Sequence, residues 1–151
     1  MLTEQLADRC DHVTATDVAV AALDATHRRL TRAGRRDSVT LLQASLDQPW
    51  PSRSCDLVVL SEVCYYLEPA VLRAVLDAEV PRLTGGATVV AAHWRHPVAD
   101  YPMAGDHAND IIGATAGLHH LGGYRDADVV IEVFDTGTPK SVAARTGVPG
   151  A

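Results

Sequence analysis

The chain has 151 residues, of which 47% are hydrophobic and 21% are charged, and this length and composition predict one globular domain over residues 1–151. The net charge of −6 excludes a general nucleic-acid binder, because neutralising phosphates needs a basic face. The sequence has no run of about 18 apolar residues and no charged-then-apolar secretory start, so we expect a cytoplasmic protein without a membrane partner. The three cysteines lack C-x-x-C spacing, and we expect buried thiols rather than disulfides or zinc ligands.

The first part of the chain alternates helical and extended patterns. The spacing of apolar residues predicts a helix, a strand, a helix, a strand and a loop, in the order Leu2 to Arg9, His12 to Thr16, Ala19 to Ala33, Val39 to Leu42 and Gln43 to Arg53. Gly34 supports the end of the second helix, since glycine suits the left-handed position that follows a helix. Asp17 follows the first strand directly, so its carboxylate stands at the carboxyl end of that strand.

The most informative stretch is the apolar run Leu57 to Leu60, which lies between Asp56 and the polar pair Ser61 and Glu62. Four consecutive apolar residues favour a strand buried on both faces of a parallel sheet over a half-exposed one. In open α/β sheets, ligands bind outside the carboxyl ends of the strands. We therefore expect Ser61, Glu62 and the following segment Val63 to Leu67 to line a crevice.

The second half of the chain continues the alternation. It predicts a helix that starts at Pro69 and is kinked or ended by Pro81, because proline suits the first turn of a helix and breaks its interior. The sequence then predicts a strand over Ala87 to Ala92 and a long polar loop over His93 to Gly105. A weak helix follows, capped by Asp106 and running toward Leu118. The last two predicted strands are Val129 to Phe134 and Ser141 to Arg145, the second as an antiparallel edge. This order predicts an α/β fold with a mainly parallel sheet and helices on both faces.

Asp17 carries the first indication of chemistry. A carboxylate between a strand and a helix can accept both hydroxyl hydrogen bonds of a ribose diol, and it can also cap the helix. Both roles stay open, and they are compatible. In nucleotide-binding folds the glycine-rich turn lies about 20 residues before this acid. Counting back from Asp17 passes Met1, so we expect that turn to be missing from this chain.

Several segments together resemble the class I S-adenosylmethionine-dependent methyltransferases, and more narrowly the nodulation protein S family of N-methyltransferases. The resemblance starts just after the position of that family's glycine-rich motif. The segments that carry this resemblance are Leu2 to Ala7 with Arg9 to Asp11, Ala15 to Asp17, Asp56 to Leu67, His93 to Arg95, Asp100 to Pro102, Gly105-Asp106, and Ser141 to Arg145. The resemblance implies a Rossmann-like methyltransferase sheet with its first strand and glycine-rich loop missing and an antiparallel C-terminal edge. We expect that the true start lies upstream, that a partner fills the gap, or that the chain rearranges.

The resemblance also implies S-adenosyl-L-methionine as the cofactor. It assigns cofactor binding to residues that follow three predicted strands, namely Asp17, Ser45, Leu46, Ser61, Glu62 and Val63. Asp17 would hold the ribose, Ser45 and Leu46 would flank the adenine, and the last three would pass close to the sulfonium. Many members carry an acid where this chain has Ser45, whose hydroxyl accepts a weaker hydrogen bond.

The implied reaction is methyl transfer to an amine, accelerated mainly by alignment and proximity. An amine must be neutral to attack, so a nearby base helps, and His93 and Asp106 are the candidate catalytic residues. Asn109 stands where this family carries a histidine. The aromatic residues of the same region are candidates either to stack on a sugar or to cover the core: Tyr65, Tyr66, Trp94 and Tyr101. The family's acceptor is the amine of a partly deacetylated chitin oligosaccharide, and we expect a small or saccharide amine here.

Two other interpretations stay open. A non-catalytic remnant, or a fragment that depends on a partner, would keep the outline of the fold without binding cofactor. A metal hydrolase would explain why this part of the chain is rich in histidines, namely His93-x-x-His96, His107 and His119-His120. These histidines lack the H-E-x-x-H spacing that places metal ligands on one helix face. We therefore expect no metal site. Because the net charge is −6, we also expect no nucleic-acid partner.

Overall fold

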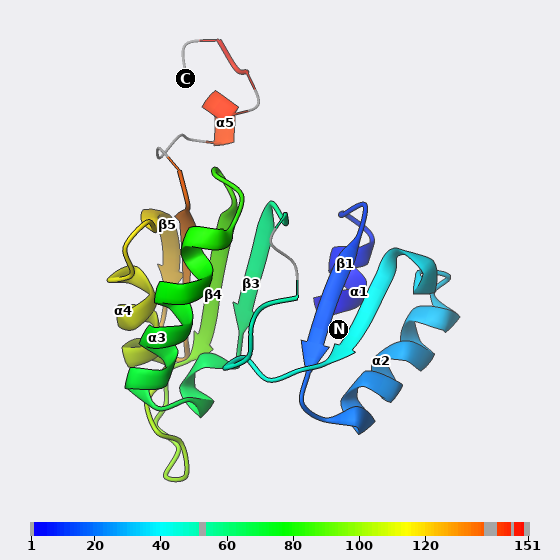
Figure 1. The fold of residues 1–151 in the computed structure, drawn as a ribbon, viewed down its shortest axis with the longest axis horizontal. Coiled ribbons are helices and arrows are strands. Elements are labelled where there is room, and N and C mark those ends of the chain that lie inside the picture. The colour runs from blue at the N-terminus through cyan, green and yellow to red at the C-terminus, as the bar shows by residue number, and fades with distance from the viewer. Residues whose placement is uncertain (1, 52–53, 138–141, 146, 150–151) are drawn as a thin grey trace. The chain divides into compact units, whose positions relative to one another are not determined.

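The computed structural model describes residues 2–51, 54–137, 142–145 and 147–149. They fall into two compact units, Met1–Ser52 and Arg53–Ala151 (Figure 1). Within the described ranges, no helix has both the length and the apolar character that a membrane crossing requires.

The first unit is a pair of parallel strands with two helices packed on it. Its elements are α1 (Leu2–Ala7), β1 (Val13–Asp17), α2 (Val20–Arg32), a 3₁₀ turn (Arg36–Ser38) and β2 (Val39–Gln43). Strands β1 and β2 pair in parallel, with Val13 opposite Val39 and Asp17 opposite Gln43. Ala7 of α1, Leu30 of α2 and Val39 form the buried core, so both helices lie on the same face of the strands. Gly34 has a φ of 65°, which confirms the predicted left-handed residue after the helix.

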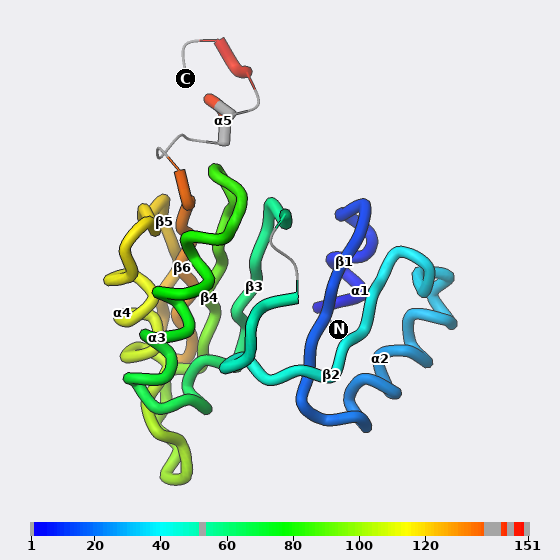
Figure 2. The backbone as a smooth tube through the Cα atoms, viewed as in Figure 1, coloured from blue at the N-terminus to red at the C-terminus, as the bar shows by residue number. Residues whose placement is uncertain are grey.

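The second unit contains a four-stranded mixed sheet. Its elements are β3 (Leu57–Ser61), a 3₁₀ turn (Cys64–Tyr66), α3 (Pro69–Glu79), a second 3₁₀ turn (Val80–Arg82), β4 (Thr88–Trp94), α4 (Gly105–Gly113), β5 (His119–Arg125), β6 (Val129–Asp135) and α5 (Val142–Arg145). The strand order is β3-β4-β6-β5. Strand β3 is parallel to β4, whereas β6 is antiparallel to both β4 and β5. Figure 2 shows the chain turning from β5 back into β6.

The prolines of α3 act as predicted. Pro69 occupies the first turn, and the helix ends at Glu79 and tightens into a 3₁₀ turn that contains Pro81. This agrees with the missing N–H and the steric clash of an interior proline. Leu72 and Leu76 on this helix are fully buried, so its apolar side forms part of the core.

The predicted C-terminal strand was wrong. Residues Val142–Arg145 form helix α5, and Ser141 lies outside the described residues. The antiparallel edge of the sheet is instead β5, a strand that the sequence did not reveal because it contains Gly122 and Gly123, and glycine is depleted in strands. An ideal Cβ on Gly123 would lie 2.4 Å from the carbonyl oxygen of Ile131, so this position accepts only glycine without a shift of the backbone.

The helix predicted from Asp106 to Leu118 is shorter than expected. Helix α4 covers Gly105–Gly113, and Gly117, with a φ of 88°, turns the chain toward β5. An ideal Cβ on Gly105 would lie 2.1 Å from the carbonyl oxygen of Trp94. The glycine therefore lets the first turn of α4 approach the end of β4, where the candidate site lies.

Candidate functional site

In the first unit, the Asp17 carboxylate lies at the end of β1, as predicted. It is exposed, and its Oδ1 accepts a hydrogen bond from the backbone N–H of Ala19 at 2.8 Å, which supports the turn into α2. Within the described part of the chain, Oδ2 has no partner. After β2, Ser45 and Leu46 are half-buried, and the N–H of Ser45 donates to Oε1 of Gln48 at 3.4 Å. This unit therefore offers one carboxylate oxygen, one hydroxyl and one apolar side chain to a ligand.

In the second unit, Glu62 has an unusual backbone conformation at the carboxyl end of β3. Its φ is 56°, in the left-handed region that non-glycine residues seldom adopt. Its N–H donates to the carbonyl of Ala92 at 2.9 Å, and the Tyr65 hydroxyl donates to its Oε2. Such backbone strain costs of order 1–3 kcal/mol and concentrates at functional sites. Ser61 and Val63 on either side are half-buried, whereas Glu62 is exposed.

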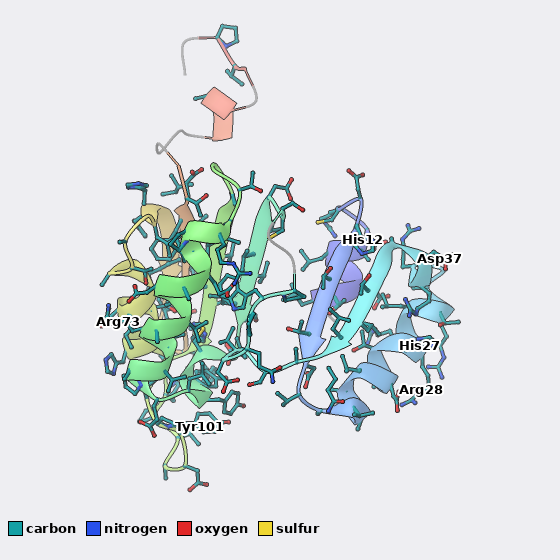
Figure 3. The ribbon with its side chains drawn as sticks, in the orientation of Figure 1. His12, His27, Arg28, Asp37, Arg73 and Tyr101 are labelled. Atoms are coloured by element: carbon teal, nitrogen blue, oxygen red, sulfur yellow. The ribbon has the colours of Figure 1, made fainter. Side chains whose placement is uncertain are left out.

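Three of the four predicted aromatic residues form one group, which we call the tyrosine cluster: Tyr65, Tyr66 and Tyr101. Tyr65 stacks on Tyr101 with ring centroids 5.0 Å apart, and Tyr66 packs edge-on against both. The hydroxyls of Tyr66 and Tyr101 are 3.0 Å apart. Tyr65 is buried and Tyr66 is 53% exposed, so the cluster has an inner and an outer part. Figure 3 shows Tyr101 beyond the carboxyl ends of β3 and β4.

Trp94 does not belong to this cluster. It follows His93 on β4, where successive side chains point to opposite faces, and it is 44% exposed while His93 is buried. Its ring packs against His96 with centroids 4.7 Å apart. The structure therefore separates Trp94 from the tyrosines with which it was predicted to act.

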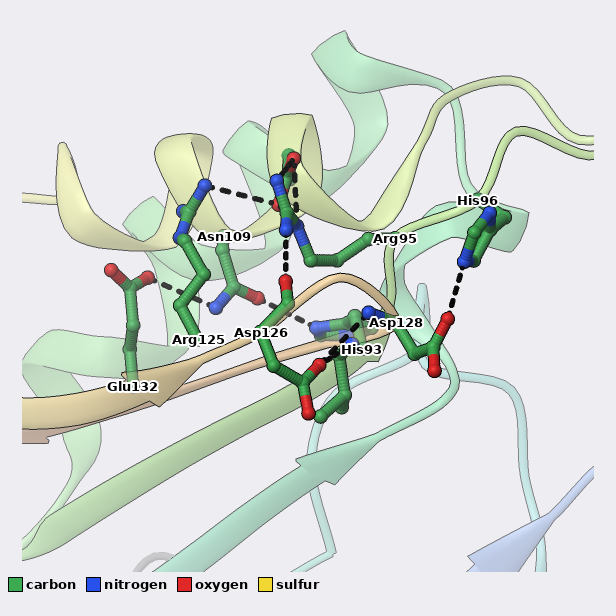
Figure 4. Close-up of polar contacts among 10 residues, drawn as sticks. His93, Arg95, His96, Asn109, Arg125, Asp126, Asp128 and Glu132 are labelled. Atoms are coloured by element: carbon green, nitrogen blue, oxygen red, sulfur yellow. Dashed lines mark hydrogen bonds and ion pairs between the residues drawn. The ribbon is translucent and has the colours of Figure 1, made fainter.

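His93 is the centre of a buried polar chain (Figure 4). Its Nδ1 is 2.7 Å from Oδ1 of Asn109, and Nδ2 of Asn109 donates to Oε2 of Glu132 at 2.9 Å. The backbone N–H of Cys64 donates to Nε2 of His93 at 3.3 Å. Because Nε2 accepts, Nδ1 must carry the proton that Asn109 accepts. Burial lowers the pKa of His93, and the bond to Asn109 opposes this only in part.

Both ring nitrogens of His93 are engaged within the protein. The ring therefore has no free lone pair with which to accept a proton, as the predicted base role requires. His93 instead fixes the backbone of Cys64, two residues after Glu62. Its catalytic role stays a prediction that the arrangement does not favour. Sequence spacing did not predict that His93 would be linked to Glu132, although a single acid within the apolar segment Val129 to Phe134 was a usable signal.

Asp106 is held by arginines. Nε of Arg95 lies 2.9 Å from Oδ1 and Nη2 lies 3.1 Å from Oδ2, while Nη1 of Arg125 is 3.4 Å from Oδ1. The hydrogen bond from Arg95 is the main cause of a pKa of Asp106 below its ordinary value. The prediction that Asp106 caps the helix was wrong, since the N-cap is Ala104 and Asp106 lies inside the first turn. An ionised carboxylate with both oxygens occupied is a weak base, so its predicted catalytic role also stays unsupported by this geometry.

Arg95 and the β5–β6 turn are part of the same polar network. Arg95 also donates to the carbonyl of Asp126, and Oδ1 of Asp126 accepts the N–H groups of Asp128 and Val129, each at 2.8 Å. Nε2 of His96 lies 2.7 Å from Oδ1 of Asp128 (Figure 4). The loop after β4 is therefore fixed to both α4 and the turn. In the described ranges, no three His, Cys, Asp or Glu side chains are grouped to hold a metal ion.

Comparison with known families assigns the chain to one of them. Residues 1–84, more than half of the chain, match the family model of the methyltransferase domain. The chain belongs to this methyltransferase family. No curated protein matches the chain.

Solved structures with the same architecture include several methyltransferases. A putative methyltransferase from Pseudomonas syringae is 25% identical, with a TM-score of 0.70, and the match covers 89% of this chain and 79% of that one. The N-methyltransferase NodS from Bradyrhizobium japonicum WM9 is 24% identical, with a TM-score of 0.74 over 89% of this chain and 79% of NodS. The glycopeptide N-methyltransferase MtfA is 16% identical, with a TM-score of 0.70 over 89% and 77% of the two chains. These likenesses confirm the predicted Rossmann-like methyltransferase fold.

Proposed function

We propose that this methyltransferase-domain protein uses S-adenosylmethionine to methylate an amine on a small or saccharide acceptor. The observation that carries the proposal is the strained Glu62 at the carboxyl end of β3, next to the tyrosine cluster, in a chain of the methyltransferase family. Ligands of open α/β sheets bind at such strand ends. The relatives NodS and MtfA, which are N-methyltransferases with structures in complex with S-adenosylhomocysteine, support both the cofactor and an amine acceptor.

The residues of the first unit fit the nucleoside part of this cofactor. Oδ2 of Asp17 is available to accept from a ribose hydroxyl, while Oδ1 already holds the turn into α2. The Ser45 hydroxyl is able to accept from an adenine amino group, and the half-buried Leu46 offers apolar surface to the adenine ring. In the second unit taken by itself, we propose Ser61 and Val63, on either side of Glu62 at the end of β3, as further cofactor residues. When bound, the cofactor supplies a methyl group to a nucleophile, and its carbon–sulfur bond breaks with the electron pair left on sulfur.

We further propose a NodS-like acceptor, the free amine of an amino sugar, and action in the cytoplasm. The likeness to NodS and the grouped tyrosines support the saccharide, because aromatic rings stack on the apolar faces of sugars. Trp94 would contribute to the same binding only through a separate surface, since it lies on the opposite face of β4 from His93.

One observation favours a second candidate, a protein that needs a partner to bind cofactor. Among the described residues, β1 pairs only with β2 and β3 pairs only with β4, so β1 and β3 each have one unpaired edge. Unpaired strand edges are sites where another strand can add. A protein of this kind would bind the cofactor only when the partner is present.

Mass spectrometry of a reaction mixture tests the proposal. The full chain is incubated with S-adenosylmethionine and glucosamine, and we expect N-methylglucosamine and S-adenosylhomocysteine in equal amounts. Asp17→Asn should reduce both products at limiting cofactor, whereas Asp24→Asn, an exposed acid of α2, should not. Turnover of neither substrate by folded protein would contradict the proposed activity and favour the second candidate.

A further inference from the structure

We propose that Glu62 is the residue that binds the acceptor amine, with its carboxylate held by Tyr65, whose ring packs against Tyr66 and Tyr101. This inference rests on the proposed methyltransferase function and deepens it. It assigns the acceptor as a primary amine that can bind as a cation, rather than a hydroxyl or an amide. The resemblance assigned Glu62 to the cofactor, so the two roles make different predictions.

The first argument is that three other titratable groups of this unit, His93, Asp106 and Glu132, are already engaged. Both oxygens of Asp106 accept from Arg95, and both nitrogens of His93 have protein partners. Oε2 of Glu132 accepts from Asn109. Glu62 differs, because it is exposed and, among the described residues, its Oε1 has no partner. It is the carboxylate of this group that is best placed to receive a ligand.

The second argument is that Glu62 is held in place before any ligand arrives. Its left-handed backbone is fixed by the N–H bond to Ala92, and its Oε2 is fixed by the Tyr65 hydroxyl. Burial of Tyr65, together with its hydrogen bond to Glu62, raises the pKa of the phenol, so it remains a donor. A fixed charge aimed at the reacting group costs no reorganisation during the reaction, which makes it more effective than a mobile one.

The third argument is the chemistry of the surrounding rings. Cations are attracted to the faces of aromatic rings within about 6 Å, and charge-assisted hydrogen bonds are about twice as strong as neutral ones. The Tyr65 ring, whose hydroxyl reaches Glu62, contacts Tyr66 at 4.9 Å and Tyr101 at 5.0 Å between centroids. A carboxylate held by one ring of this cluster favours an ammonium group over a neutral one.

The same contacts explain how the amine would react. An acceptor that has lost one proton to solvent donates an N–H to Oε1 of Glu62, which directs its nitrogen lone pair away from the carboxylate. As that lone pair forms the N–C bond to the transferred methyl group, and the carbon–sulfur pair stays on sulfur, positive charge develops on the nitrogen. Glu62 stabilises this charge in the transition state, and the product leaves as a methylammonium ion.

Calorimetric titrations of the full chain test this inference, with glucosamine as the amine probe and N-acetylglucosamine as its neutral counterpart. Each sugar is titrated with and without S-adenosylhomocysteine. We expect Glu62→Gln to weaken glucosamine binding at least ten-fold and to leave S-adenosylhomocysteine affinity within two-fold. Glu68→Gln, which removes the same charge from an exposed residue whose side chain makes no cap hydrogen bond, should change neither.

The outcomes separate the two proposals. Wild-type protein that binds N-acetylglucosamine as well as glucosamine, or a Glu62→Gln variant that loses only S-adenosylhomocysteine, would overturn the acceptor role. Failure of wild-type protein to bind S-adenosylhomocysteine, with glucosamine binding still dependent on Glu62, would overturn the proposed function and leave the amine site standing. If Glu62→Gln does not fold, Tyr65→Phe decides: it should weaken glucosamine binding about three-fold, and unchanged binding would contradict the inference.

Discussion

Nδ1 of His93 lies 2.7 Å from Oδ1 of Asn109, and both side chains are fully buried between β4 and α4. Asn109 stands where the family resemblance led us to expect a histidine, and it connects His93 to Glu132. We therefore interpret this chain of contacts as the support of the loop that carries Glu62, rather than as a catalytic base.

Replacing Asn109 should destabilise the protein. Asn109→Leu leaves the buried Nδ1–H of His93 and one oxygen of Glu132 without their partner, and each unsatisfied buried group costs about 1–3 kcal/mol. The free energy of unfolding in urea measures the loss. His107→Ala, an exposed position on the same helix, should change it by less than about 0.5 kcal/mol, and equal losses in the two variants would contradict the structural role.

A pair of glycine substitutions tests the β5–β6 edge that the sequence did not reveal. An ideal Cβ on Gly123 would lie 2.4 Å from the carbonyl oxygen of Ile131, while one on Gly122 would have nothing within 4 Å. Gly123→Ala should therefore lower the unfolding free energy by about 1–3 kcal/mol and Gly122→Ala by much less. Thermal unfolding of both variants gives the comparison, and equal midpoints would show that β5 does not pair in this register.

The ion pair between Asp106 and Arg95 predicts a pH dependence of stability. The folded-state pKa of Asp106 is lowered by the hydrogen bond from Arg95, so its contribution is fully present above the unfolded value of about 3.9 and is lost as pH falls through the folded pKa. Wild type should be more stable than Asp106→Asn at pH 7, and the difference should shrink in acid. Urea unfolding at pH 7 and at pH 3 measures it, and a difference that grows in acid would reverse the assignment.

The cysteines should differ in reactivity. Cys64 is fully buried, and burial raises its pKa to about 12, whereas Cys10 and Cys55 are half-buried. The thiolate is the reactive form, so a thiol reagent at pH 8 should modify Cys64 only after denaturation. Peptide mapping after brief labelling identifies the modified residues. Rapid modification of Cys64 in native protein would mean that the turn following Glu62 opens readily.

The sequence was a good guide where periodicity and side-chain chemistry agree. The unbroken apolar run of β3 predicted a strand of a parallel sheet, and β3 pairs in parallel with β4. The prediction that both of its faces are buried was wrong, since Leu57 to Val59 are only half-buried. Pro81 ends α3 as expected. Strand β5 was missed because its glycines are present for close backbone packing, which depends on β6 and is not visible in a local pattern. The C-terminal segment at Val142–Arg145 was taken for a strand, although four residues carry too little periodicity to separate helix from strand.

The candidate site was predicted in part. The sequence placed Glu62, Tyr65 and Tyr66 after the carboxyl end of β3, and the structure joins Tyr66 to Tyr101 across 35 residues of sequence. It did not predict that His93 and Asp106 would be fully engaged with protein partners. Such engagement depends on tertiary contacts with Cys64, Asn109 and Arg95, which no sequence spacing specifies.

The most direct test of the central claim is the binding of S-adenosylhomocysteine by the full chain, measured by isothermal titration calorimetry. If Asp17 contributes a free carboxylate oxygen to a ribose, wild-type protein should bind one equivalent with micromolar affinity, and Asp17→Asn should bind about ten-fold more weakly. The exposed control Asp24→Asn should match wild type. No heat from folded wild-type protein, or equal affinity in wild type and Asp17→Asn, would contradict the claim.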